Sequence, residues 1–157
     1  MKKKITIIAI ILLVVIVIGY LCLRPPKETL QIPISVDHIQ SISLYYTNEG
    51  SKKVIDTQTD IEAILQGVQN ARIWGTYIPG RVPAGVQSFT VRFDLDDGTH
   101  FSFAYSQSSK AGSGYYSDGT NYYRLVSLDL YTVWESLAFP AVCMNAQEEL
   151  AGIPTPF

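Results

Sequence analysis

The 157-residue chain has only two cysteines and two histidines, and this scarcity limits the sites it can build. Cys22 lies in an apolar run near the N-terminus, so Cys143 alone remains beyond it and no internal disulfide is available there. His38 and His100 have no metal-ligand neighbour at zinc-site spacing. We therefore predict a domain without cofactor or metal, whose core is stable without cross-links.

Basic residues are also few beyond residue 24. From Pro25 onward, eight Lys and Arg side chains against fourteen Asp and Glu side chains leave a formal charge of −6. An acidic domain is repelled by phosphate backbones and by anionic lipid headgroups. The composition thus argues against nucleic acid as a partner.

Motifs that carry catalysis are missing as well. The chain contains no nucleophile elbow, no phosphate-binding loop and no recognisable pairing of His with Cys or Ser. Asp94, Asp96 and Asp97 crowd one turn and are weak calcium candidates, but their spacing is not that of an EF-hand loop. Asp and Gly are ordinary hairpin-loop residues, so we predict a turn there and a non-enzymatic protein. An active site assembled from residues far apart in the sequence remains an alternative.

What the chain does have is a long apolar run. Fourteen of the nineteen residues from Ile5 to Leu23 are Ile, Leu or Val, after three lysines, Lys2 to Lys4. As a helix this run would span roughly 28 Å, close to the thickness of a bilayer core. The flanking lysines place the N-terminus in the cytoplasm. We predict a single-pass cell-membrane protein whose C-terminal domain is extracellular.

Two alternatives to a permanent anchor remain. Val17-Ile18-Gly19 is a poor but possible signal-peptidase site, and Cys22 would be a lipidation site only if the large Leu21 were tolerated before it. The predicted organisation is a cytoplasmic segment (1–4), an anchor (5–23), a proline-containing stalk (24–36), a folded domain (37–139) and a flexible tail (140–157).

Alternating patterns predict the strands of the domain. They indicate strands at 40–46, 52–55 and 73–78, then two hairpins. In the first hairpin, a three-residue Asp96-Asp97-Gly98 loop would pair Phe93 with Phe101 and keep both aromatic rows on one face. The second hairpin turns at 117–121.

Two helices complete the pattern. Thr59 to Glu62 has the form of a capping box before the stripe Ile61, Ile64, Leu65 and Val68. A closing helix follows Ser127, the expected N-cap. We predict an α+β fold: an antiparallel sheet of about six or seven strands, with two helices on one face, after one N-terminal transmembrane helix.

Three segments carry a resemblance to a known group of proteins: residues 59–65, Phe93-Asp94-Leu95-Asp96-Asp97-Gly98, and Asp118-Gly119-Thr120-Asn121-Tyr122-Tyr123. With the anchor and stalk, this order resembles the small extracytoplasmic domains of unknown function of Gram-positive bacteria. The resemblance covers roughly residues 39 to 137 and implies location and fold only. Many of those domains are lipoproteins, a pattern from which Leu21 departs.

Adjacent tyrosines are the remaining candidate site. Six form three pairs: Tyr45-Tyr46, Tyr115-Tyr116 and Tyr122-Tyr123. Neighbours on a strand face opposite ways, so each pair would send one ring away from the helices. Such rings either simply cover the sheet or bind an envelope protein or cell-wall component. We favour a binding module as the function; the alternative is an accessory subunit of a membrane complex acting through Ile5 to Leu23.

Overall fold

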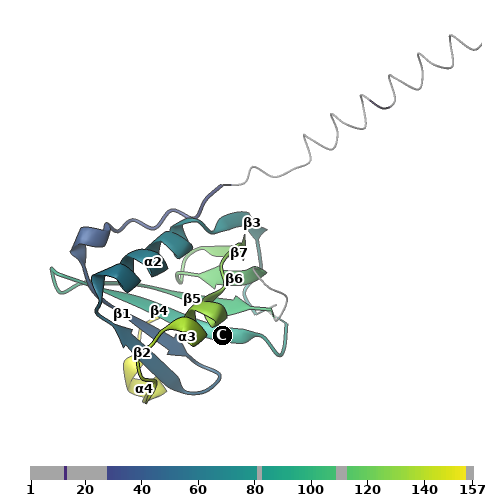
Figure 1. Ribbon diagram of the computed structural model, residues 1–157. Helices are drawn as coiled ribbons and strands as arrows, with labels where there is room; N and C mark the ends of the chain where they lie inside the picture. The colour runs from purple at the N-terminus through teal and green to yellow at the C-terminus, as the bar shows by residue number, and fades with distance from the viewer. Residues whose placement is uncertain (1–12, 14–27, 81–82, 109–112, 155–157) are drawn as a thin grey trace, which may run out of the picture.

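The fold is a single antiparallel sheet with helices on one side. The computed structural model describes residues 13, 28–80, 83–108 and 113–154. Its sheet has eight strands in the order β3-β7-β6-β5-β4-β1-β2-β8. Helices α2 and α3 lie across the same face (Figure 1). The predicted α+β class with an antiparallel sheet is therefore confirmed.

The centre of the sheet is built from long strands of alternating character. Strand β1 (Ile39–Tyr46) lies between β2 (Ser51–Ile55) and β4 (Gln87–Leu95), and β4 also pairs with β5 (His100–Gln107). Phe93 pairs with Phe101, and Leu95 and Thr99 close the loop by hydrogen bonding, with Gly98 at φ +81°. The predicted three-residue loop and its register are confirmed, because only this register buries both aromatic rows.

The second hairpin forms the other end of the sheet. Strands β6 (Ser113–Ser117) and β7 (Tyr122–Val126) pair with Tyr116 opposite Tyr123, and β3 (Arg72–Thr76) adds to β7 as the outermost strand. In the turn, the Asp118 carboxylate accepts hydrogen bonds from the backbone N–H groups of Thr120 and Asn121. This local bonding sets the turn where the sequence predicts it.

Helix α2 (Gln58–Gln69) packs on the sheet through the predicted stripe, since Ile61, Ile64, Leu65 and Val68 are all buried. The predicted capping box is wrong. The N-cap is Thr57, whose side chain makes no capping hydrogen bond, and Thr59 lies inside the first turn. Glu62 instead accepts a hydrogen bond from the amide of Gln58. Burial of the stripe, rather than a cap, decides where this helix sits.

Helix α3 (Leu130–Ser136) begins later than predicted. Its N-cap is Asp129, whose Oδ1 accepts a 3.0 Å hydrogen bond from the N–H of Thr132. Ser127, the expected cap, instead has a left-handed backbone with φ +70°. The chain needs this turn because Leu128 enters the core, where its carbonyl accepts a hydrogen bond from the Tyr105 hydroxyl.

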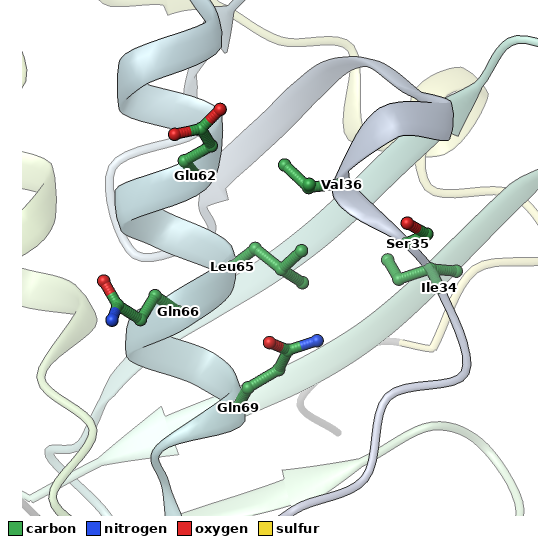
Figure 2. Close-up of a pocket in the computed structure, with 7 residues that line it drawn as sticks. All are labelled: Ile34, Ser35, Val36, Glu62, Leu65, Gln66 and Gln69. Carbon is green, nitrogen blue, oxygen red and sulfur yellow. The ribbon is translucent and has the colours of Figure 1, made fainter.

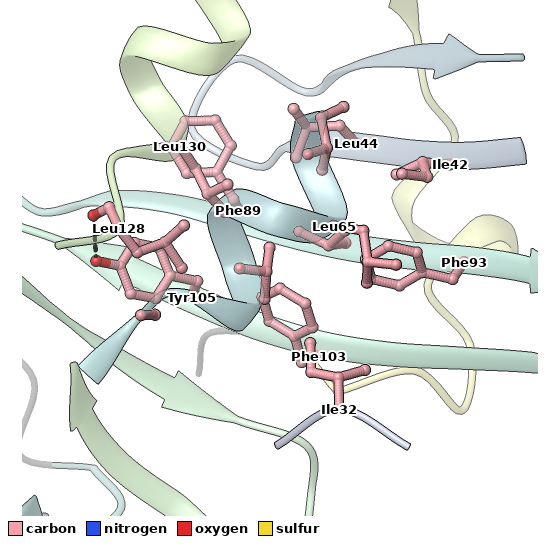
Figure 3. Packing of buried hydrophobic residues seen from close by; sticks show 14 of the residues in the cluster. Ile32, Ile42, Leu44, Leu65, Phe89, Phe93, Phe103, Tyr105, Leu128 and Leu130 are labelled. Atoms are coloured by element: carbon pink, nitrogen blue, oxygen red, sulfur yellow. Dashed lines mark hydrogen bonds between the residues drawn. The ribbon is translucent and has the colours of Figure 1, made fainter. Parts of the chain in front are cut away.

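The core lies between the helices and the inner face of the sheet (Figure 3). Aromatic residues from β4 and β5 fill its centre, and aliphatic residues from β1 and the helices surround them. Fully buried side chains include Ile42, Leu44, Phe89, Phe93, Phe103 and Tyr105. At about 1.5–3 kcal/mol for each buried large side chain, this layer is the main source of stability.

Segments on either side of the predicted domain also join it. Residues 28–36, expected in the stalk, run along α2 and bury Leu30 and Ile32 (Figure 1). Beyond residue 140, expected to be a flexible tail, β8 (Val142–Cys143) pairs with β2, and α4 (Ala146–Glu149) follows. Strand β8 is one reason that the sheet exceeds the predicted six or seven strands.

The predicted anchor lies outside the described residues, apart from Leu13. Within the part of the chain that the structure describes, no helix has the length and apolarity needed to cross a bilayer.

Candidate functional site

The structure divides the three tyrosine pairs between the two faces of the sheet. Tyr46 and Tyr116 belong to the core under the helices, and Tyr123 packs against it. Tyr115 and Tyr122 lie on the opposite face, which we call the open face, on neighbouring strands β6 and β7. Tyr45 is also on the open face but is only 3% exposed. It lies three strands from Tyr115, so these six residues do not form one surface.

Tyr115 and Tyr122 instead join residues that were not among the predicted site. The Tyr77 ring meets both edge-on, with ring centroids 5.2 Å from Tyr115 and 5.7 Å from Tyr122. The Arg124 guanidinium lies 5.8 Å from the Tyr115 ring centroid and 6.0 Å from that of Trp74. We call this group the aromatic patch: Trp74, Tyr77, Tyr115, Tyr122 and Arg124.

A β-bulge in β3 places Tyr77 on the open face. Ile73 pairs with Leu125 in the core, and the next pair is Gly75 with Arg124, so Trp74 is the extra residue. Such an insertion reverses the facing of every residue after it. Tyr77 would share the core-facing side with Ile73 in a regular strand, but the bulge moves it to the open face. Sequence parity alone therefore missed it, although Gly75 is a signal for a bulge.

The patch is accessible. Trp74 is 60% exposed, Arg124 is exposed, and the three tyrosines are half-buried. Burial, and then the neighbouring tyrosines Tyr122 and Tyr115, raise the pKa of Tyr77 to about 12. Like that of other tyrosines, its phenol is neutral at physiological pH and can donate a hydrogen bond. The patch combines flat apolar rings, a phenol donor and a cation on one surface.

The charge of this end of the sheet differs from that of the domain. Strands β3, β6 and β7 contain Arg72 and Arg124 but no acidic residue, while Asp118 lies in the β6–β7 turn and Glu28 lies beside β3. The three ion pairs found among the described residues use other cations. Every Asp and Glu of the chain is described, so neither Arg72 nor Arg124 pairs with an acidic side chain. Arg72 alternates with core-facing Ile73 and so projects from the open face.

A hollow elsewhere on the open face is lined by polar side chains whose cations are paired with carboxylates. It has a volume of about 330 Å³ and lies between the sheet and α4, beside Tyr45 and His100. Arg92 bonds Asp94 at 2.7 Å, and Lys52 bonds Glu149, whose pKa is lowered mainly by that hydrogen bond. Because both cations already have carboxylate partners, the hollow has little capacity left for an anionic ligand.

Another hollow lies on the helix side, between α2 and the segment before β1 (Figure 2). Its volume is about 570 Å³. Leu65, Ile34 and Val36 supply its apolar surface, and Glu62, Gln66, Gln69 and Ser35 supply its polar groups. No cation lines this hollow, and its apolar residues belong to the packing of α2 against the chain.

The weak metal candidates each have another partner. Asp94 bonds Arg92, Asp97 accepts hydrogen bonds from the backbone and hydroxyl of Thr99, and Asp96 lies 3.0 Å from His38. The hydrogen bond and charge of Asp96 raise the pKa of His38. Among the described residues, no group of three or more His, Cys, Asp or Glu side chains is placed to hold a metal ion.

No protein-family model, curated protein or solved structure matches this chain. The resemblance to small extracytoplasmic domains therefore stays a prediction, and the residues of the open face are the best indication of function.

Proposed function

We propose that the chain is a non-enzymatic, membrane-anchored extracytoplasmic domain that binds an envelope component through the aromatic patch. The observation that carries this proposal is the 60% exposure of Trp74 beside Arg124, which pairs with no acidic side chain. Exposing a large aromatic ring to water costs free energy, and Trp, Tyr and Arg are the residues most enriched where binding energy concentrates.

The same features distinguish a binding surface from aromatic rings that only shield the sheet from water. Tyr45 shows how this protein covers a ring: the ring is 3% exposed in the hollow beside α4. Trp74 lies on the same face of the sheet, but among the described residues it receives no such cover and is 60% exposed. The apolar run from Ile5 to Leu23 and the lysines before it support the proposed location.

The test is co-sedimentation of the purified full-length protein, in detergent micelles, with purified cell-wall and envelope fractions. We expect the double variant Trp74→Ala, Tyr115→Ala to lose most binding, because both rings lie at the surface that we assign to the ligand. Tyr45→Phe is the matched control, since it changes a tyrosine of the same face outside the patch. Equal retention of all three proteins by the envelope would disprove a binding role for the patch.

The apolar run itself favours a second candidate, an accessory subunit that contacts its complex within the membrane. Replacing Ile5 to Leu23 with an unrelated membrane helix separates the two. A binding module keeps its envelope binding after the exchange, whereas an accessory subunit loses its partner even with an intact aromatic patch.

A further inference from the structure

We propose that the aromatic patch recognises an acidic glycan, a polysaccharide whose sugar rings carry carboxylate groups. This inference rests on the proposed binding function and names its ligand class. Three properties of the patch lead to it: the charge of its surface, the chemistry of its exposed groups, and the distance between its cation and its rings.

Charge complementarity indicates that the ligand is negatively charged. Residues 25–157 carry a formal charge of −6, yet the three strands that bear the patch hold two arginines and no acidic side chain, and the flanking Asp118 and Glu28 pair with neither arginine. Elsewhere on the open face, Arg92 and Lys52 are neutralised by Asp94 and Glu149. An anion approaching the domain therefore meets available positive charge at this end of the sheet.

The exposed chemistry favours a sugar over a peptide. The patch lies on the face of the sheet, where β6 and β7 have paired strands on both sides, and the outer side of β3 bonds Glu28 at Ile73. A peptide that adds to a sheet takes its affinity from free backbone groups at an edge. Here the available groups are aromatic rings, phenols and a guanidinium, which suit a ring with one apolar face, hydroxyls at its rim and an anionic substituent.

The spacing favours a carboxylate borne directly on the sugar ring. The Arg124 guanidinium is within 6.0 Å of the centroids of two exposed or half-buried rings, Trp74 and Tyr115. A ligand that stacks on either ring must therefore present its anion close to the stacked unit. A carboxylate on the sugar meets this demand and matches the planar, two-pronged guanidinium.

The chain also contains its own reporter of binding. It has two tryptophans, of which Trp134 is 4% exposed and Trp74 is 60% exposed. Stacking of a sugar on Trp74 removes water from that ring, so its fluorescence should shift to shorter wavelength and resist an aqueous quencher. Trp134 is already shielded and contributes a constant background.

The test is titration of the full-length protein in micelles with an oligogalacturonate, followed by Trp fluorescence and calorimetry. The neutral control is the same oligosaccharide with its carboxylates methyl-esterified, which keeps the rings and removes the charge. We expect the acid to bind and to shield Trp74, and the ester to bind at least about tenfold more weakly, as for loss of a charge-assisted hydrogen bond.

Single-residue variants test whether the oligogalacturonate binds at the aromatic patch. Arg124→Gln should weaken oligogalacturonate binding at least about tenfold, and Trp74→Ala should abolish the fluorescence change. Arg92→Gln is the matched control: it removes an arginine from the same face that is already paired with Asp94, and binding should stay unchanged. Thermal unfolding of each variant verifies that it is folded.

Several results would overturn the assignment. If the ester binds as tightly as the acid, the patch does not recognise the carboxylate charge. If Arg92→Gln weakens binding as much as Arg124→Gln, the effect comes from the overall charge of the surface. Tighter binding of polyglutamate would indicate an acidic peptide, and tighter binding of a polyglycerol phosphate would indicate phosphate-linked polymers. If the patch variants lose envelope binding while oligogalacturonate binds nowhere, the binding function stands and the acidic glycan is excluded.

Discussion

Gly114 shows how one residue without a side chain accommodates the core. It lies on β6 beneath the ring of Tyr105, which is fully buried and hydrogen-bonded to the Leu128 carbonyl at 2.8 Å. A Cβ atom on Gly114 would overlap that ring. The close approach therefore requires glycine at this position.

We expect Gly114→Ala to lower the free energy of unfolding by about 1–3 kcal/mol, the usual cost of overpacking a core. Gly67→Ala is the control, because Gly67 lies in α2 and a Cβ atom there would meet nothing within 4 Å. The control should gain up to about 1 kcal/mol from helix propensity. Urea unfolding followed by circular dichroism measures both. Equal stability of the Gly114 variant and the wild type would show that the ring moves aside freely.

Lys53 is a charged side chain that stabilises the fold from inside. It is 8% exposed, and its ammonium donates hydrogen bonds to the carbonyls of Trp134 and Leu137 at 2.7 and 2.9 Å. It also lies 4.8 Å from the Trp134 ring centroid. These carbonyls belong to the C-terminal end of α3, where the helix has no further N–H groups to offer. Lys53 therefore ties α3 to β2.

We expect Lys53→Met to destabilise the protein by about 1.5–3 kcal/mol, because buried carbonyls lose a charged donor. Lys52→Met is its neighbour on the opposite face and removes the partly exposed bond to Glu149 and a cation 5.9 Å from the Tyr45 ring centroid, which should cost at most about 1 kcal/mol. Chemical denaturation of the two variants compares them directly. A smaller loss for Lys53→Met than for Lys52→Met would refute the capping role.

At the scale of elements, the N-terminus of α3 depends on a carboxylate. Burial acts to raise the pKa of Asp129, but hydrogen bonds from Gln107 and Thr132 outweigh it, and the net effect lowers the pKa. Gln107 also accepts a hydrogen bond from the N–H of Tyr131, so it links β5 to the first turn of α3. The cap thus joins helix to sheet.

A lowered folded-state pKa means that the Asp129 contribution is present above the unfolded pKa of about 3.9 and is lost as pH falls through the folded value. Below about pH 4, the free energy of unfolding of the wild type should therefore fall as Asp129 becomes protonated. Asp129→Asn has no carboxylate at this position, so it lacks this contribution at every pH. We expect the variant to be less stable than the wild type at neutral pH by about 1 kcal/mol, because its amide nitrogen cannot accept the hydrogen bond that Asp129 Oδ2 takes from the Thr132 hydroxyl, and we expect the difference to shrink in acid. Urea midpoints between pH 7 and pH 3 measure it; a constant difference would contradict the linkage.

The elements that sequence patterns located well are those set by neighbours along the chain. The Asp96-Asp97-Gly98 loop and its register depend on turn residues and on alternation, both of which are local. The α2 stripe was predicted for the same reason. The caps of α2 and α3 were misplaced because several residues near each helix start can cap, and contacts with the sheet select among them. Gln107 on β5, for example, selects Asp129.

At the scale of the whole molecule, the chain after residue 140 closes over the open face. The backbone N–H of Met144 donates to the carbonyl of Gly50, Lys52 bonds Glu149, and Ile153 is 8% exposed. The hydroxyl of Thr90 reaches the carbonyl of Pro154 at 3.4 Å. Neither α2 nor α3 covers the open face. The closing segment therefore explains why small polar residues there, such as Thr90 and Ser43, are buried.

We expect Ile153→Ala to cost about 2 kcal/mol, as for loss of a buried aliphatic side chain. Val142→Ala changes an aliphatic residue of the same segment that is 45% exposed, and it should stay within about 0.5 kcal/mol of the wild type. Differential scanning calorimetry compares the two. Identical melting of Ile153→Ala and wild type would show that the segment adds nothing to stability.

The sequence by itself determined the α+β class, the central hairpin with its register and the buried stripe of α2, because period and turn chemistry act between residues close in the chain. Only the tertiary structure decided which tyrosines share a surface. The bulge after Ile73 turned Tyr77 outward, the closing segment covered Tyr45, and the pairing of β3, β6 and β7 brought Trp74, Tyr115 and Arg124 together. These outcomes depend on contacts between distant segments, which alternation along one strand does not encode.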